Sequence, residues 1–172
     1  MLFSQTLLQE FDEEMRNTRK LLEVIPDGKL NYRPHAKSMT LAELATHVAT
    51  LPGWTKSLLD EDVLDLPPDM KGELAGSRAQ LLQMFDQGVT EARGRIRAAS
   101  DEYWQTTWTF KIGGNTLLAK PRAAVMRSEI LNHLVHHRAQ LGVYLRLNHV
   151  AIPGMYGPSA DEPKLGAAAQ AA

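Results

Sequence analysis

The sequence predicts an all-α fold: a four-helix bundle with long connections and a small hairpin between the third and fourth helices. Apolar residues recur every three or four positions through four long segments, as on the buried face of an amphipathic helix. Proline and glycine residues interrupt this pattern between the segments. Residues 104–118 instead combine aromatic and β-branched residues with Gly113 and Gly114, which is typical of a hairpin.

The apolar stripes predict four helices, over residues 3–25, 40–59, 73–99 and 121–147. Pro26 and Gly28 end the first helix, and Pro121 suits the first turn of the fourth. The polar residues 29–39 and the acidic, proline-rich residues 60–72 are expected to form loops. The long connections after the second and third helices allow helices that follow one another in the chain to lie apart in the fold.

The second helix carries its own start signal and an interruption. Thr40 is followed three residues later by Glu43, which is the pattern of a capping box. Pro52 lies inside the helix and cannot donate a hydrogen bond to the carbonyl group of Val48. We therefore expect a kink at this proline.

The chain of 172 residues is long enough for one domain with a sizeable core. We expect that domain over residues 1–165 and a mobile tail over residues 166–172. Residues 152–162 contain prolines and glycines that prevent an extension of the fourth helix. Because they also carry large apolar side chains, we expect them to pack back on the bundle, with Tyr156 at least partly buried.

The composition excludes several classes of protein. The chain contains no cysteine, which excludes disulfide scaffolds, zinc ribbons and thiol nucleophiles. No stretch approaches the ~18 uninterrupted apolar residues of a membrane helix, and the first ten residues lack the features of a secretory signal. We expect a cytoplasmic protein that does not bind membranes.

The charged residues are unevenly distributed along the chain. The net charge is −1, but residues 1–89 carry an excess of five acidic groups and residues 90–150 an excess of five basic groups. These charges can neutralise one another within one chain or across a dimer, or lie on separate solvated faces. A nucleic-acid-binding protein usually carries a basic excess along one face, so we expect no nucleic-acid partner.

Three of the six histidines share the apolar faces of two predicted helices. His133 and His137 lie one helical turn apart on a mostly apolar row. His47 is the one titratable residue on the apolar row of the second helix. His136 falls on a polar row with Glu129, facing solvent or a partner chain, so we expect no carboxylate near the three inward histidines.

Buried imidazoles must satisfy both of their ring nitrogens. Three converging neutral imidazoles can do so by sharing a divalent metal, and three histidines with an open fourth position form a known catalytic metal site. The alternative is that each histidine is satisfied separately in the core. The aromatic residues Trp54, Trp104, Trp108 and Tyr144 are expected to lie in the core, where one of them could line a pocket.

The last helical segment resembles a known protein family. Residues 132–147, which read Asn-His-Leu-Val-His-His-Arg-Ala-Gln-Leu-Gly-Val-Tyr-Leu-Arg-Leu, look like the last helix of the damage-inducible DinB family. Residues 40–49 resemble the second helix of that family, with its single histidine, and residues 152–162 resemble its closing segment. The resemblance spans residues 1–162.

The resemblance to the DinB family implies a four-helix bundle, often dimeric, with a metal held by three histidines. The matching positions in this sequence are His47, His133 and His137. Many members of the family bind zinc or nickel, and a few have thiol-dependent transferase or isomerase activity. We therefore expect a divalent metal, zinc or nickel, and a homodimer.

Two functions are compatible with these residues. The leading hypothesis is a metal-dependent enzyme for small-thiol-dependent group transfer or hydrolysis, in which the metal activates a bound water or thiol. The sequence identifies no general base. The alternative is a non-catalytic stress-related or binding protein whose metal site is structural or vestigial. An open coordination position that faces a pocket would favour the enzyme.

Overall fold

A computed structural model describes residues 3–163, so the predicted tail over residues 166–172 lies outside the described residues. Its helices are α1 (Phe3–Glu23), α2 (Leu41–Thr50), α3 (Trp54–Asp60), α4 (Arg78–Ala98), α5 (Asp101–Gln105), α6 (Arg122–Val125) and α7 (His133–Leu147). Short 3₁₀ turns cover Asp27–Lys29 and Leu51–Gly53, and a π-helical segment, Met126–Asn132, joins α6 to α7. The strands are β1 (Val63–Leu66), β2 (Thr107–Ile112) and β3 (Asn115–Pro121).

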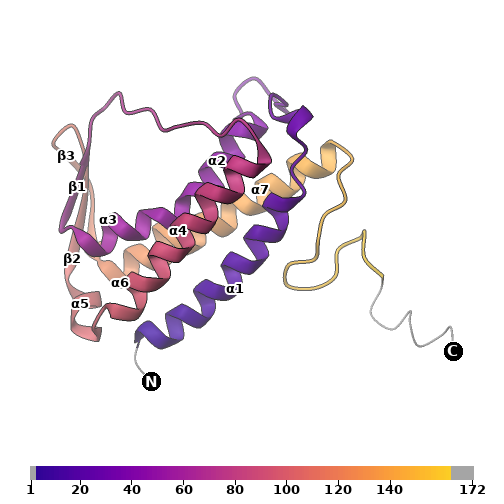
Figure 1. The fold of residues 1–172 in the computed structure, drawn as a ribbon. Helices are drawn as coiled ribbons and strands as arrows, with labels where there is room; N and C mark the ends of the chain where they lie inside the picture. The colour runs from indigo at the N-terminus through magenta and orange to yellow at the C-terminus, as the bar shows by residue number, and fades with distance from the viewer. Residues whose placement is uncertain (1–2, 164–172) are drawn as a thin grey trace, which may run out of the picture.

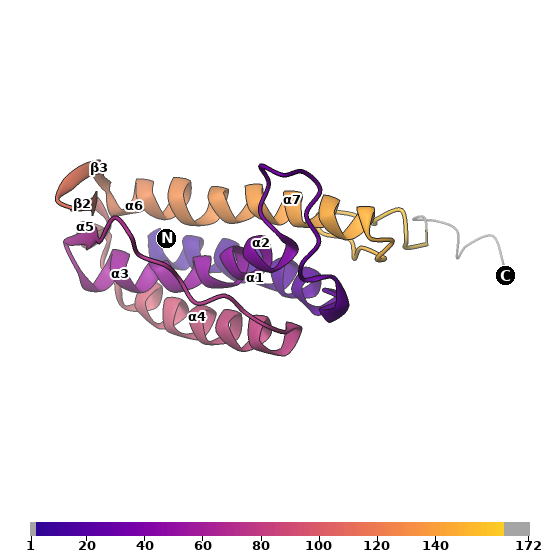
Figure 2. The ribbon, with the colours of Figure 1, turned by 90° about the horizontal axis from the view of Figure 1, so that it is seen from above.

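The long helices lie side by side, with α1 against α4, α2 and α3 against α4, and α2 against α7 (Figures 1 and 2). They follow the predicted helical segments, although two boundaries differ. The first helix ends at Glu23. The third begins at Arg78 rather than near residue 73, because Ser77 caps it by accepting a hydrogen bond from the backbone N–H of Gln80 (3.2 Å).

The predicted start and interruption of the second helix are confirmed. The side-chain oxygen of Thr40 accepts a hydrogen bond from the backbone N–H of Glu43 (3.1 Å), whose carboxylate accepts one from the backbone N–H of Thr40 (2.6 Å). The 3₁₀ turn that contains Pro52 separates α2 from α3. Gly88 of α4 packs directly on this turn, where a Cβ atom would lie 3.0 Å from the backbone nitrogen of Gly53.

A small three-stranded mixed sheet corrects the prediction of an all-α fold. The predicted hairpin is present as the antiparallel pair β2 and β3, but β1 also pairs with β2, in parallel. The predicted loop 60–72 therefore contains a strand. Local sequence could not reveal it, because a four-residue edge strand between acidic and proline residues is stabilised by a partner more than forty residues away.

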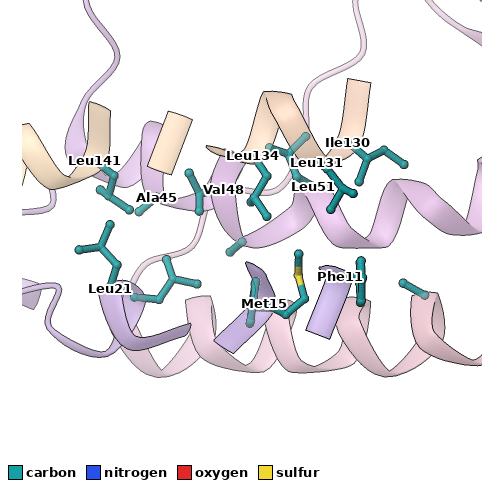
Figure 3. Close-up of a cluster of buried hydrophobic side chains, with 14 of the residues drawn as sticks. Phe11, Met15, Leu21, Ala45, Val48, Leu51, Ile130, Leu131, Leu134 and Leu141 are labelled. Atoms are coloured by element: carbon teal, nitrogen blue, oxygen red, sulfur yellow. The ribbon is translucent and has the colours of Figure 1, made fainter. Parts of the chain in front are cut away.

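The core lies between α1 and the helices that cover it (Figure 3). Phe11 of α1, Val48 of α2 and Leu134 of α7 are each fully buried. The contact of α2 with α7 in this core brings the two predicted histidine-bearing helices together. Within residues 3–163, no helix has both the length and the hydropathy needed to cross a bilayer.

The closing residues 152–162 fold back on the helices as an irregular segment. Ile152 and Met155 pack against the core. The carboxylate of Asp161 accepts two hydrogen bonds from Arg146 (2.6 and 2.9 Å) and one from the backbone N–H of Ile152 (2.8 Å). These contacts, with Arg146 contributing most, lower the pKa of Asp161 to about 2. Apolar packing and an ion pair thus hold the segment in place.

The expectation that Tyr156 is at least partly buried is wrong, because Tyr156 is an exposed residue with a relative exposure of 67%. Its hydroxyl group is held at the surface of the helices, where it donates to the carboxylate of Glu14 (2.8 Å) and accepts a hydrogen bond from Arg138. The guanidinium group of Arg138 also lies 5.4 Å from the centre of the ring. Polar anchoring therefore takes the place of the expected burial.

A buried arginine holds the start of the last helical segment against its neighbours. The side chain of Arg122 is completely buried. Its guanidinium group donates hydrogen bonds to oxygen atoms of Leu58, Glu61, Asp62 and Thr106. It also lies 4.4 Å from the centre of the Tyr103 ring. Arg122 thus connects α6 to the end of α3 and to the segment that enters β2.

We predict that Arg122→Met lowers the free energy of unfolding by about 3 kcal/mol, because several buried oxygen atoms lose their donor. The matched control is Arg127→Met, in the adjoining π-helical segment. Arg127 pairs with Glu10 at the surface and is 47% exposed, so its loss is expected to cost less than about 1 kcal/mol. Guanidinium unfolding curves measure both changes. Equal losses would contradict the role of Arg122.

Candidate metal centre

The three histidines predicted as metal ligands come together. His47 lies in the last turn of α2, His133 begins α7, and His137 follows one turn later. The Nε2 atom of His133 lies 3.2 Å from that of His47 and 2.9 Å from that of His137. Ring nitrogens of all three residues lie within 4.8 Å of one another, so the group could hold a metal ion.

The outer nitrogens of two of these rings are fixed by hydrogen bonds. His133 Nδ1 donates to the carbonyl oxygen of Glu129 (3.2 Å), and His137 Nδ1 donates to the side-chain oxygen of Gln140 (2.8 Å). Because both acceptors are oxygens without a proton to give, the Nδ1 atoms carry the protons. In the neutral form of each ring, the Nε2 atoms of His133 and His137 therefore turn unprotonated lone pairs toward each other.

This arrangement fits a bound cation. Two facing lone pairs 2.9 Å apart repel each other unless a positive charge lies between them. Nitrogens that bind one tetrahedral zinc ion at about 2.0–2.1 Å lie about 3.3 Å apart, close to the spacings of 2.9 and 3.2 Å seen here. In metal sites, the ring N–H that does not bind the metal usually donates a hydrogen bond to an oxygen atom, which orients the histidine.

The three imidazoles are half-buried. Burial, followed by the neighbouring His137 and His133, lowers the pKa of His47 from 6.5 to about 4. Burial also lowers the pKa of His137, although its hydrogen bond with Gln140 acts in the opposite direction. Both residues are therefore neutral at pH 7, which is the form that binds a metal.

His136 lies outside the group, as predicted from its helical phase. Its side chain is exposed. Its Nε2 atom accepts a hydrogen bond from the side-chain nitrogen of Gln140 (3.1 Å). Gln140 therefore joins the exposed His136 to His137.

The expectation that no carboxylate lies near the three histidines is wrong for Glu129, which lines the same cavity as His47 and His133. Its carboxylate accepts a hydrogen bond from Ser128 (2.9 Å) and lies 3.5 Å from the ammonium group of Lys120. Glu129 belongs to the π-helical segment. A π-helix has more residues per turn than an α-helix, so an α-helical wheel misplaces residues that precede His133.

A cavity of about 180 Å³ adjoins the histidines. Its walls are mostly apolar and include Leu51, Trp54, Trp108, Phe110, Leu118 and Ile130. Periodicity alone does not distinguish the aromatic residues that line a cavity from ordinary core residues. Trp104 and Trp108 lie in the core as expected, and Trp108 also lines the cavity, whereas Trp54 lines the cavity but is 36% exposed.

A second, wider hollow of about 670 Å³ also borders His47. Its walls carry charges of both signs, from Arg33 and Lys37 and from Glu43 and Glu73. His47 therefore lies where an apolar cavity and a polar hollow meet, and a small molecule bound in either one can reach its ring.

Comparison with known proteins identifies the family. The model of the DinB family matches residues 1–170. The chain belongs to the DinB family. The sequence matches none of the curated proteins.

Solved structures of DinB-like proteins share this fold. A DinB-like protein from Bacillus cereus ATCC 10987 is 21% identical, with a TM-score of 0.68; the match covers 87% of this chain and 95% of that one. A DinB-like protein from Bacillus subtilis is 16% identical, with a TM-score of 0.65; the match covers 87% of this chain and 97% of that one. The small mixed sheet is thus part of a mainly helical chain with a DinB-like fold.

We predict that His133 carries its proton on Nδ1 in the metal-free protein above neutral pH, because Nδ1 faces a carbonyl oxygen. Two-bond ¹⁵N–¹H correlation spectra measure this directly. His35 is an internal control with the opposite arrangement, since its Nδ1 accepts a hydrogen bond from the backbone N–H of Lys37 (3.2 Å). A proton on Nε2 of His133 would contradict the proposed orientation.

Proposed function

We propose that this DinB-family protein is a metal-dependent enzyme in which His47, His133 and His137 hold one divalent ion, zinc or nickel. The observation that supports the proposal is the convergence of three imidazoles, two of which have their outer nitrogens fixed by oxygen acceptors. Neutral histidine nitrogens suit both metals. The bound ion would lower the pKa of a water or small thiol that it holds, and so supply a nucleophile near neutral pH.

The side chains around the histidines suit a catalytic site. Within residues 3–163, the group that could hold a metal consists of three histidines, which leaves a fourth position for a small molecule. His47 and His133 line an apolar cavity that can hold part of a substrate away from water. Small-thiol-dependent group transfer and hydrolysis are the two reactions that this arrangement supports.

A structural metal site in a non-catalytic binding protein is the alternative. Structural zinc sites are almost always closed by four protein ligands. Glu129 lines the adjoining cavity but is not in the group whose ligand atoms lie within 4.8 Å of one another. The enzyme is therefore the better supported function.

We predict about one zinc ion per chain in the wild-type protein and a loss of at least tenfold in zinc affinity for His133→Ala, because this variant removes a proposed ligand. His136→Ala is the matched control, since His136 lies one residue from His137 and is exposed. Elemental analysis after dialysis against competing chelator measures the zinc content. Equal zinc retention by the two variants would overturn the assignment.

We also propose that the chain forms a homodimer in the cytoplasm, with residues 1–165 as one bundle-type domain. The support for a dimer is the family, whose members are often dimeric, because Arg93, Arg95 and Arg127 already pair with Asp12, Asp60 and Glu10 within the chain. Sedimentation at micromolar concentration in low salt is expected to show a dimer of twice 19.1 kDa. A monomer at every accessible concentration would contradict it.

A further inference from the structure

We propose that the cavity beside the histidines binds an apolar group of about the size of one aromatic ring, carried by a small-molecule substrate. The position of the substrate's reacting atom, next to His47 and His133, rests on the proposed function. The shape and chemistry of the cavity do not depend on it, because they come from side chains of α2, α3, the sheet and the segment before α7.

Aromatic side chains form a fixed wall of the cavity. The rings of Trp108 and Phe110 are parallel to within 2°, with centres 6.1 Å apart. The ring of Trp54 meets Phe110 edge to face, with centres 6.2 Å apart. The indole N–H of Trp108 already donates to the carbonyl oxygen of Ser57 (3.2 Å). The wall therefore offers aromatic ring faces and edges to an occupant, and the indole N–H of Trp108 is not available to bind it.

The size of the cavity selects a small ring. A cavity of about 150 Å³ lined by leucine, isoleucine and phenylalanine stays dry and binds benzene. The cavity here is slightly larger, about 180 Å³, and its walls are mostly apolar but also include His47, His133 and Glu129. Burying a benzene-sized group against the apolar walls removes apolar surface from water.

The polar groups of the cavity orient this occupant. The polar residues that line the cavity are His47, His133 and Glu129. His47 and Trp54 also line the wider polar hollow. A substrate with its ring in the cavity can therefore extend its polar part past His47 into that hollow. The class of substrate is a small molecule with an uncharged apolar ring at one end.

Fluorobenzene is a suitable probe, because it has the size of one aromatic ring. Its ¹⁹F resonance reports binding directly, so the measurement does not rely on the fluorescence of the tryptophans in the cavity wall. We expect the metal-free wild-type protein to bind it saturably. Leu118 lines the cavity, whereas its neighbour Leu117 on the same strand is 60% exposed. Leu118→Trp, which fills the cavity, should weaken binding at least tenfold, and Leu117→Trp should change it less than twofold.

The pair Leu118→Asn and Leu117→Asn repeats the comparison with smaller side chains, in case the tryptophan variant does not fold. The expected result is the same order of affinities, because an amide makes the cavity wall polar. Failure of wild-type protein to bind fluorobenzene, or equal binding by the folded variants at Leu118 and Leu117, would overturn the proposal. Because this test uses metal-free protein, a failure of metal binding would leave its result intact.

A second measurement tests the location of the ring. Cobalt(II) is paramagnetic and zinc is not, so bound fluorobenzene should show a much broader ¹⁹F resonance in the cobalt-loaded protein than in the zinc-loaded protein. Equal line widths in two proteins shown to contain one ion per chain would place the ring away from the histidines and overturn the proposal. A protein that takes up neither ion would instead contradict the proposed function.

Discussion

The convergence of three imidazoles in a half-buried site is the constraint on which the proposed chemistry depends. Each ring nitrogen that leaves water must find a partner, and the oxygens of Glu129 and Gln140 satisfy only the outer nitrogens of His133 and His137. The inner nitrogens then face one another at 2.9 Å. A shared cation resolves this conflict, and the rest of the fold can be understood as the support that keeps the rings in place.

That support comes from the packing of α2 on α7 and from two buried arginines in the last helical segment. Arg122 connects its start to α3 and to the entry of β2. Five residues after His133, the buried Arg138 binds the carbonyl oxygen and the carboxylate of Glu14 on α1 (3.0 and 2.6 Å). The segment that carries two of the three histidines is therefore tied to separate helices, and the small sheet closes one wall of the adjoining cavity.

The helices and the inward faces of the three histidines could be predicted from sequence because both depend on local periodicity, whereas their convergence depends on the non-local packing of α2 on α7. A one-turn spacing puts His133 and His137 on one face whatever the fold, and the apolar row through His47 faces the core in any helical arrangement. The strand β1 could not be predicted, because its pairing with β2 is non-local. Glu129 was misplaced because a π-helical segment changes the phase of residues just before His133. Tyr156 was misjudged because its polar contacts with Glu14 and Arg138 hold it at the surface.

X-ray absorption at the zinc edge of the zinc-loaded, wild-type protein tests the central claim most directly. Three imidazole nitrogens and one further light atom at about 2.0–2.1 Å are expected, and addition of a small thiol should replace the light atom with a sulfur at about 2.3 Å. This result would show both the three-histidine set and its open position. Fewer than three imidazoles, or a fourth ligand that the thiol does not displace, would contradict the account.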